Sequence, residues 1–260
     1  MVQTIPDILA CIVASKQAAL AGMRPRRDAL ERRAAERTQF RDFRGALTAR
    51  QPAIIAEIKK GSPSKGTFTE QFEPSKLARE YASGGAAALS VLTDAEFFQG
   101  GLEDLETARA AAPLPVLRKD FTIDEFHVVE AAAHGADAIL LIAAILDESE
   151  MRRLRELSAR YQMAALVEVH DEFEVDSALA SGAEMVGVNN RNLHTFNVTL
   201  ETSLRLAEKI PSGVVKVAES GIHSREDVRR LQAAGFDAFL IGERLVTAAD
   251  PTAALRELQS

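Results

Sequence analysis

The chain has 260 residues, 47% of them hydrophobic and 27% charged, which is typical of a globular enzyme and argues against a disordered, collagen-like or fibrous protein. Its single cysteine, Cys11, excludes an internal disulfide framework and a cysteine-rich zinc site, and it favours a cytoplasmic protein. The net charge of −7 argues against a nucleic-acid partner, and the lack of an uncharged apolar stretch of about 18 residues argues against a membrane partner.

Residues 5–21 form the first apolar stretch and resemble a signal sequence in composition. However, no basic segment precedes them, and Asp7 and Lys16 lie within them, which is atypical of a signal sequence. Five apolar residues follow helical spacing instead: Ile5, Ile8, Leu9, Ile12 and Val13. The stretch therefore predicts an amphipathic helix.

Residues 24–50 are rich in arginine. Nine arginines stand against four acidic residues, so this segment carries a charge of +5 and the rest of the chain carries −12. The charge fits either a nucleic-acid-binding arm or a solvated helix with ion pairs such as Asp28 with Arg32. No aromatic-interleaved platform accompanies the arginines, which favours the helix. We expect residues 1–50 to be a helical extension packed on a catalytic domain of residues 51–260, within one structural unit.

From residue 53 onward, a short apolar run and an amphipathic stretch alternate eight times. The predicted strands are 53–59, 87–93, 114–119, 138–144, 164–169, 185–190, 214–219 and 238–243. Glycines precede four of them, where left-handed caps end helices, and Ser224 with Asp227 reads as a helix N-cap. Eight such units predict a closed (β/α)8 TIM barrel. An open doubly wound sheet is the alternative, although no nucleotide-binding glycine motif follows any strand.

Polar side chains gather at the carboxyl ends of these predicted strands, where barrel enzymes place their active sites. The residues concerned are Glu57, Lys59, Lys119, Glu168, Asn189, Arg191, Glu219 and Ser220. Each of them alone could belong to a structural ion pair or a cap. Because unpaired buried charge costs several kcal/mol, their convergence on one end of a barrel instead predicts a ligand site.

The loops after the last two predicted strands contain Ser220 with Gly221 and Gly242 with Glu243. Glycines there let backbone amides approach an anion, and many barrels bind phosphate at this position; two tight turns are the alternative. Lys59, Arg191 and the 61–66 loop, which includes Ser62, are further candidate phosphate donors. The five histidines are scattered, so we expect no metal site, and His170 is interpreted as a loop residue.

Seven motifs in chain order resemble those of the indole-3-glycerol-phosphate synthases. They are IAEIKKGSPSKG (55–66), SVLTDAEFFQG (90–100), LRKDF (117–121), LVEVH (166–170), GVNNRNL (187–193), AESGI (218–222) and LIGERL (240–245). Residues 8–16 (ILACIVASK) also resemble the helical segment that precedes the barrel in this family. The resemblance implies a (β/α)8 lyase of tryptophan biosynthesis that closes the indole ring of 1-(2-carboxyphenylamino)-1-deoxyribulose 5-phosphate. It implies release of carbon dioxide and water, with no metal or organic cofactor.

Motif by motif, the resemblance implies roles for individual residues. Those implied in catalysis are Lys119, Glu168, Lys59, Glu57 and Asn189, with Glu219 and Ser220 close by. Those implied in phosphate binding are Lys59, Arg191, Gly221, Gly242 and Glu243. Lys119 is our candidate acid for ring closure, but the sequence leaves the acid and base assignments among Lys119, Lys59 and Glu168 open. We expect an apolar pocket for the anthranilate ring, lined by Phe97, Phe98, Leu141 and Leu193.

Two places depart from the family pattern: Arg244 stands where a small residue is common, and Ala18 and Ala19 follow Lys16 where an acid often occurs. Two other functions stay open. One is another sugar-phosphate barrel enzyme, such as a phosphoribosylanthranilate isomerase, and the other is a barrel that only binds a phosphorylated ligand. The sequence also leaves open a monomer or an association with other enzymes of tryptophan biosynthesis.

Overall fold

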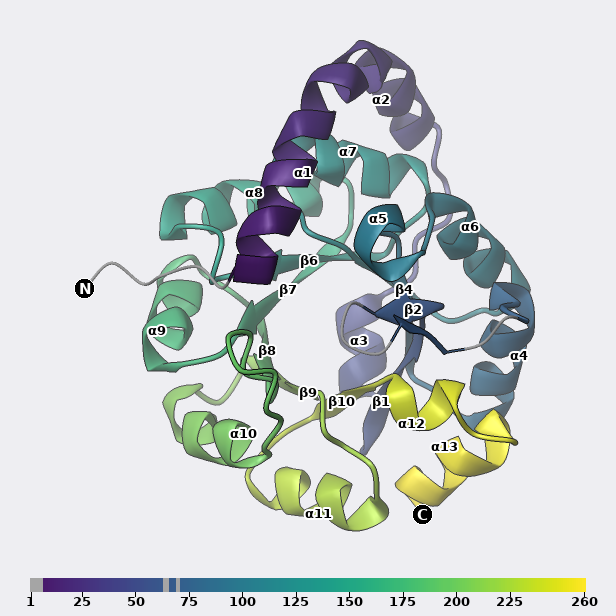
Figure 1. Ribbon diagram of the computed structural model, residues 1–260, viewed down its shortest axis with the longest axis vertical. Helices are drawn as coiled ribbons and strands as arrows, with labels where there is room; N and C mark the ends of the chain where they lie inside the picture. Colours follow the sequence, from purple (N-terminus) through teal and green to yellow (C-terminus); the bar gives the residue numbers. More distant parts are fainter. Residues whose placement is uncertain (1–6, 63–65, 69–70) are drawn as a thin grey trace.

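The computed structural model describes residues 7–62, 66–68 and 71–260, in which eight parallel strands close into a barrel (Figure 1). The strands are β1 (Ala53–Ile58), β4 (Ala88–Leu92), β5 (Val116–Lys119), β6 (Ala138–Ile142), β7 (Ala164–Val169), β8 (Met185–Asn189), β9 (Val215–Glu219) and β10 (Ala238–Ile241). Each strand pairs with its neighbour in the chain, and β10 pairs with β1, with Ala53 opposite Ala238. The TIM barrel is therefore confirmed, and the open sheet is wrong. A small hairpin of β2 (Gly61–Ser62) and β3 (Gly66–Thr67) follows β1.

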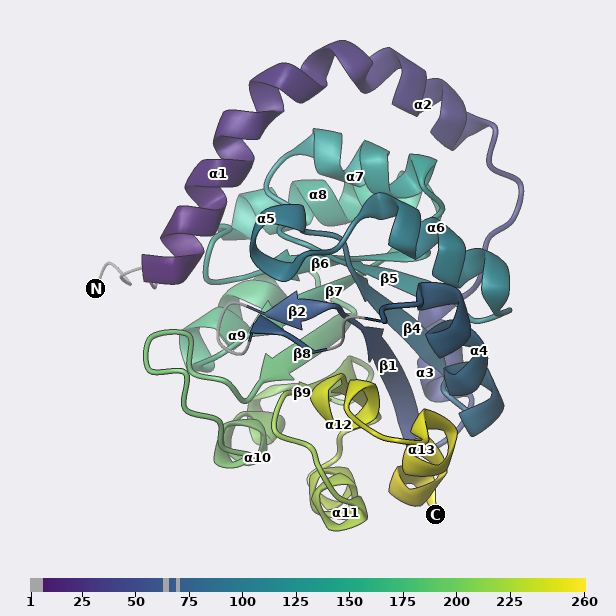
Figure 2. The ribbon, with the colours of Figure 1, turned by 45° about the vertical axis from the view of Figure 1, so that its right-hand side comes forward.

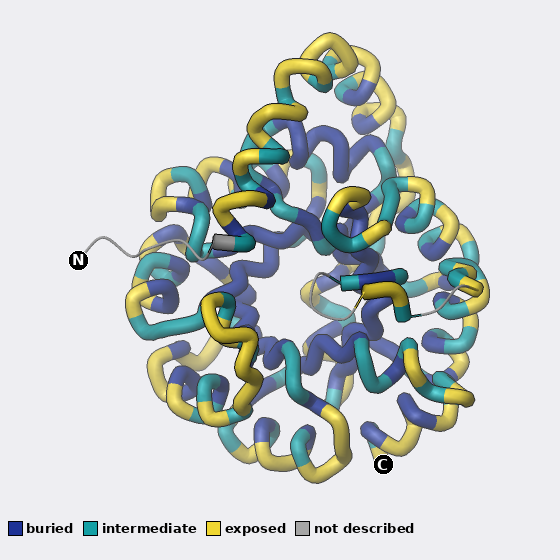
Figure 3. Tube along the Cα trace, in the orientation of Figure 1, coloured by how far each residue is buried: buried dark blue, intermediate teal, exposed yellow. Residues whose placement is uncertain are grey.

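Helices surround the strands, and their exposed faces point outward (Figure 3). The outer helices are α4 (Pro74–Gly84), α6 (Leu102–Ala111), α7 (Glu125–Ala133), α8 (Glu148–Arg160), α9 (Glu172–Ala180), α10 (Glu201–Leu206), α11 (Arg225–Ala233) and α13 (Pro251–Gln259). Two short helices, α5 (Ala95–Phe98) and α12 (Glu243–Val246), follow strand ends. Ser224 and Asp227 form the predicted N-cap as a reciprocal capping box. The predicted glycine caps adopt positive φ angles at Gly85, Gly135, Gly182 and Gly235.

The strands carry apolar side chains on both faces, because helices cover the outside and side chains fill the inside. Ile55, Leu140 and Leu166 belong to the cluster inside the barrel. Ile54 and Leu141 belong to the larger cluster between strands and helices. Alternation then places Glu57, Lys119 and Glu168 on the inner face at the carboxyl ends of β1, β5 and β7, each two residues after an inner apolar residue.

The N-terminal segment reaches both ends of the barrel (Figure 2). It contains α1 (Asp7–Met23), a short 3-10 turn (Arg24–Arg26), α2 (Arg27–Ala35) and α3 (Phe43–Thr48). Helix α1 confirms the predicted N-terminal helix, with Leu9 and Ile12 buried, while Ile5 lies outside the described residues. Helix α2 packs on α7, and α3 inserts Phe43 and Leu47 into the cluster inside the barrel.

The arginines of this segment differ from the expected solvated helix. Among the described residues, the structure pairs Arg27 with Glu31 at 2.8 Å rather than Asp28 with Arg32. Arg37 forms an ion pair with Asp137, a residue 100 positions away that precedes β6. Such partners cannot be found from helical spacing within one segment. None of the helices in the described part of the chain is long and apolar enough to cross a membrane.

Candidate active site

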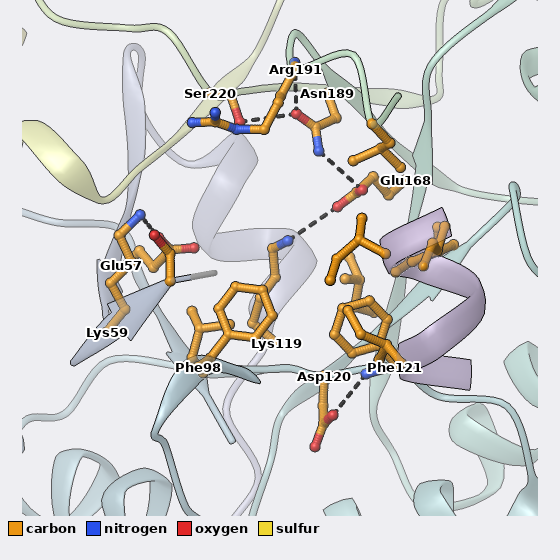
Figure 4. Close-up of a pocket in the computed structure, with 18 of the residues that line it drawn as sticks. Glu57, Lys59, Phe98, Lys119, Asp120, Phe121, Glu168, Asn189, Arg191 and Ser220 are labelled. Atoms are coloured by element: carbon orange, nitrogen blue, oxygen red, sulfur yellow. Dashed lines mark hydrogen bonds and ion pairs between the residues drawn. The ribbon is translucent and has the colours of Figure 1, made fainter. Parts of the chain in front are cut away.

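The predicted polar residues meet at the carboxyl end of the barrel (Figure 4). Glu57, Glu168, Asn189 and Glu219 come from four different strands, and each is at most 9% exposed. Lys119 ends a fifth strand and projects into the same space. Only strand alternation and barrel closure bring these residues together, since they are spread over more than 160 positions of sequence.

Lys119 lies between two carboxylates. Its Nζ is 3.0 Å from Glu168 Oε2 and 3.5 Å from Glu219 Oε2. Burial disfavours the ammonium, but the charges of Glu168, Glu219 and Glu57 outweigh burial and raise the pKa of Lys119. The amine is therefore protonated at neutral pH and can donate a proton or a hydrogen bond.

The pKa values of Glu168 and Glu219 are shifted in opposite directions. Burial opposes the charge of Glu168, but Lys119, His170 and Asn189 outweigh it and lower the pKa of Glu168. Burial raises the pKa of Glu219 to about 7, because Lys119 offsets it only in part while Glu168 and Glu57 repel a second negative charge. Two carboxyl groups held in different protonation states suit an active site that must both take up and give away protons.

Asn189 connects Glu168 to the next strand end. Its Nδ2 donates to Glu168 Oε1 at 3.1 Å, and its Oδ1 accepts from Ser220 Oγ at 2.9 Å and from the backbone N–H of Arg191 at 3.0 Å. Ser220 has a φ of +66°, an uncommon conformation for a residue other than glycine. Strained backbone of this kind concentrates at functional sites, where the surrounding contacts hold it.

Two glycines leave space for the carboxylates. A Cβ atom on Gly242 would lie 2.1 Å from Glu57 Oε1, and one on Gly187 would lie 2.2 Å from Glu219 Oε1. Glu57 in turn pairs with Lys59 at 2.9 Å. The glycine after β10 thus allows the Glu57–Lys59 pair to approach the backbone of the loop that was predicted to bind phosphate.

Two cavities adjoin at this end of the barrel and share seven lining residues: Glu57, Lys59, Lys119, Asn189, Arg191, Ser220 and Glu243. We call them the apolar cavity and the polar cavity. The apolar cavity also contains Ser62 and is lined by Ile8, Leu9, Ile12, Phe68, Leu92, Phe98, Phe121, Leu140, Ile142, Leu193 and Phe196. The polar cavity is lined by the loops after β9 and β10, including Ser220, Gly221, Gly242, Glu243 and Arg244.

Two of the four predicted ring-pocket residues are wrong. Phe98 and Leu193 line the apolar cavity, whereas Phe97 and Leu141 do not. Leu141 points outward to the helices, and its neighbours Leu140 and Ile142 face the cavity, because a shift of one residue along a strand changes the face. Phe97 precedes Phe98 on α5, where successive side chains are about 100° apart.

Sequence reasoning missed the residues that surround this site. Lys16 on α1 pairs with Asp94 at 2.9 Å and with Asp120 at 2.6 Å, which ties the helix over the apolar cavity to the ends of β4 and β5. His170 is a loop residue as expected, but it also contacts Glu168. The Lys16 pairs could not be found from the sequence, since Lys16 lies 78 and 104 residues from its partners.

The remaining predicted features also have defined places. Arg244 pairs with Glu257 of α13 at 3.0 Å, so its side chain is held at the rim of the polar cavity. Residues 63–65 of the predicted 61–66 loop lie outside the described residues. Within the described ranges, no three histidine, cysteine or acidic side chains gather in a way that could hold a metal ion.

Comparison with known proteins agrees with this geometry. The family model described as "Indole-3-glycerol phosphate synthase" matches residues 9–258. A protein of that name from Albidiferax ferrireducens is 50% identical over 97% of this chain and 98% of its own length. Another of that name, from Koribacter versatilis, is 54% identical over 88% of each chain.

Among solved structures, a 3-hexulose-6-phosphate synthase is similar with a TM-score of 0.63 and 19% identity, covering 80% of this chain and 98% of that one. At this identity the structural likeness supports the fold alone. The family match and the sequence relatives extend over nearly the whole chain. The chain therefore belongs to the indole-3-glycerol phosphate synthase family, the carboxy-lyases of tryptophan biosynthesis.

Proposed function

We propose that the barrel mouth closes the indole ring of 1-(2-carboxyphenylamino)-1-deoxyribulose 5-phosphate and releases carbon dioxide and water. The observation that carries this proposal is the pair of adjoining cavities, one apolar and one rich in glycine and polar groups, with charged side chains between them. The substrate has the same order of parts: an aromatic ring at one end, a phosphate at the other and the reacting carbons between. The apolar cavity suits the ring, and the polar cavity suits the phosphate.

In the first step, the aromatic carbon attacks the ketone carbon, a C–C bond forms and the carbonyl oxygen takes up a proton. We assign that proton to Lys119, whose ammonium is stabilised by Glu168 and Glu219. Loss of carbon dioxide then returns the electron pair of the broken bond to the ring system. Glu219, with a pKa of about 7, is a second proton donor or acceptor beside Lys119.

In the last step, the hydroxyl leaves as water after protonation and a carbon-bound proton is removed, which completes the aromatic ring. We assign the base to Glu168, because its lowered pKa keeps it ionised and Asn189 fixes its orientation. Lys59, held by Glu57, is the candidate acid for the leaving hydroxyl and also a phosphate contact. Further phosphate contacts are assigned to Ser62, Arg191, Ser220, Gly221, Gly242 and Glu243.

Arg37 is occupied by Asp137, and Arg41 donates to the carbonyls of Ala112 and Leu114, which argues against a nucleic-acid-binding arm. The free Cys11 is compatible with a cytoplasmic location. A phosphorylated small molecule is the partner that this site would bind.

The test is the appearance of indole fluorescence from the carboxyphenylamino substrate, followed in the full chain and in Lys119→Ala. We expect wild-type turnover, and a kcat that falls at least ~10²-fold in the variant with a much smaller change in KM, because a general acid acts mainly in the transition state. Lys209→Ala is the matched control, since Lys209 pairs with Asp176 on the surface.

A wild-type chain that isomerises phosphoribosylanthranilate but does not form indole would favour the related isomerase activity. Binding of the substrate without turnover would favour a ligand-binding barrel. Near-normal kcat in folded Lys119→Ala would remove Lys119 from the reaction.

A further inference from the structure

His170 lies beside the carboxylate that we assign as the base. It follows β7 directly, two residues after Glu168, so both side chains leave the same face of the chain. Its Nε2 is 3.3 Å from Glu168 Oε1, and its Nδ1 is 2.9 Å from Glu174 Oε2 on α9. The same oxygen of Glu174 accepts the backbone N–H of His170 at 2.7 Å. The imidazole is therefore anchored to Glu174 by a hydrogen bond at Nδ1, while Nε2 faces Glu168 at ion-pair distance without a hydrogen bond of its own.

The two oxygens of Glu168 have different surroundings. Oε2 faces Lys119 at 3.0 Å, on the side of the apolar cavity. Oε1 lies 3.1 Å from Asn189 Nδ2 and 3.3 Å from His170 Nε2. Asn189 and His170 thus contact Oε1, on the side away from the cavity. With Oε1 held there, Oε2 points toward the reacting atoms.

The imidazole ring is buried: only 14% of the His170 side chain is exposed, against 4% for Glu168 and 7% for Glu174. Burial disfavours its charged form, but the hydrogen bonds and charges of Glu168 and Glu174 outweigh burial and raise the pKa of His170 to about 10. Other charged groups nearby come from the neighbouring elements. They are Lys119 on β5, Glu219 on β9, and Asp171, Arg191, His194 and Arg205 around an adjoining cavity.

We propose that His170 is a positioning residue for the ring-forming reaction: anchored by Glu174, it lies against Glu168 and holds that carboxylate aimed at the substrate. The proposal rests on the assignment of Glu168 as the base. Replacing His170 with a neutral side chain removes a positive charge next to the Glu168 carboxylate. The replacement does not change a substrate contact, because His170 is not among the residues that line the two substrate cavities.

The first experiment is the pH profile of kcat/KM for His170→Gln, in which the amide can still donate a hydrogen bond but carries no charge. We expect the midpoint of the acidic limb to rise by at least about one pH unit, since the charge of His170 lowers the pKa of both Glu168 and Glu219, and a nearby positive charge typically lowers a carboxyl pKa by 1–3 units. Near pH 8, where Glu168 is ionised in either protein, KM should change less than about twofold.

The matched control is His134→Gln. His134 is also a partly buried histidine that pairs with a glutamate, with its Nδ1 2.8 Å from Glu106 Oε1, but it lies on the outer helices. A merely structural role for His170 would lower the stability of the protein and leave the acidic limb of folded protein in place, as we expect for His134→Gln.

A second measurement does not depend on the folding of His170→Gln. The ring nitrogens of wild-type protein labelled with 15N-histidine are observed by NMR, and His170 is assigned by elimination with variants at His127, His134, His194 and His223. We expect an imidazolium at pH 8. A neutral ring at pH 8, or an unchanged acidic limb in His170→Gln, would overturn the proposal.

Glu168→Gln separates this proposal from the proposed function. If Glu168→Gln keeps near-normal turnover, the assignment of the base fails, whatever His170 does. If Glu168→Gln is inactive while His170→Gln keeps the wild-type pH profile, the base assignment stands and the role of His170 alone is wrong.

Discussion

The two ends of the barrel both bury charge, but they treat it differently. At the amino end of the strands, the carboxylate of Asp137 is fully buried and pairs with Arg37 and with Arg109 at 3.1 Å. It also accepts the backbone N–H groups of Arg41 and Val116 at 3.1 and 3.0 Å. At the carboxyl end, Oε1 of Glu219 is buried without a hydrogen-bond partner. A satisfied buried charge specifies the fold, whereas an unsatisfied one indicates where a ligand or a reaction supplies the missing partner.

The N-terminal segment serves both ends. Helix α1 covers the apolar cavity with Ile8, Leu9 and Ile12, and the Lys16 ion pairs hold it there. Helix α3 closes the opposite end, where Phe43 and Leu47 are at most 1% exposed. We therefore propose that the N-terminal extension, described from residue 7 to residue 50, is an integral part of the barrel, with one part acting on substrate and another on stability.

The largest change in stability is expected at the amino end of the strands, where the charge of Asp137 is fully paired. Asp137→Ala should lower the free energy of unfolding by about 3–5 kcal/mol, because it leaves Arg37 and Arg109 facing one another without their shared partner. Protein that remains folded should keep its kcat and KM. Urea denaturation followed by circular dichroism measures the loss. Asp176→Ala, which removes an exposed carboxylate near Lys209, should cost less than about 1 kcal/mol. Equal losses in the two variants would contradict this view of the amino end.

The sequence predicts the barrel well because each βα unit carries its own signals. The apolar strands, the glycine caps such as Gly135 and the capping box at Ser224 depend only on residues close in sequence. The candidate site also follows from local information, since the last residue of every strand must lie at one end of a closed parallel barrel. That is why the sequence alone predicts that Lys119 and Glu168 lie together.

The features that could not be predicted depend on partners far apart in sequence or on the facing of strands. Arg37 meets Asp137 and Lys16 meets Asp120, each across about 100 residues. Leu141 was assigned to the wrong face because β6 is apolar on both faces, so no alternation of polar residues fixes which side points inward. The role proposed for His170 depends on its contact with Glu174, the third residue of the next helix, which the strand pattern alone does not reveal.

A smaller effect is expected at the phosphate end of the site. Arg191→Ala should raise KM about 10–100-fold with little change in kcat, because a charged hydrogen bond to phosphate contributes about 1.5–3 kcal/mol in substrate and transition state alike. Steady-state kinetics with inorganic phosphate as competitor provide the check. Phosphate should inhibit the wild type and inhibit Arg191→Ala much less. Arg230→Ala, which removes an exposed pair with Glu201, is the control. Equal inhibition of wild type and Arg191→Ala would exclude Arg191 from the phosphate site.

The last prediction concerns Glu219 at the carboxyl end of the strands and the pH dependence of the free energy of unfolding. Burial raises the pKa of Glu219 from its ordinary value of 4.5 to about 7. Between these values the folded protein keeps a proton that the unfolded chain has released, so this group makes the folded state less stable as pH rises through that window. The contribution is fully present below pH 4.5 and is lost above pH 7.

The side chain in Glu219→Gln does not ionise, so the variant avoids this loss of stability. Its unfolding free energy should exceed that of the wild type by an amount that grows from pH 4.5 to pH 7 and is then constant. Each 1 kcal/mol of this gain corresponds to about 2–4 °C in Tm for a chain of this size. Melting curves of the two proteins at pH 4.5 and pH 8 measure the difference, with Glu257→Gln at the surface as control. A gain that is equal at both pH values, or larger in acid, would show that Glu219 does not hold its proton in the folded protein. Stabilisation together with lost turnover would show that the carboxyl group at the mouth is kept for the reaction at the expense of the fold.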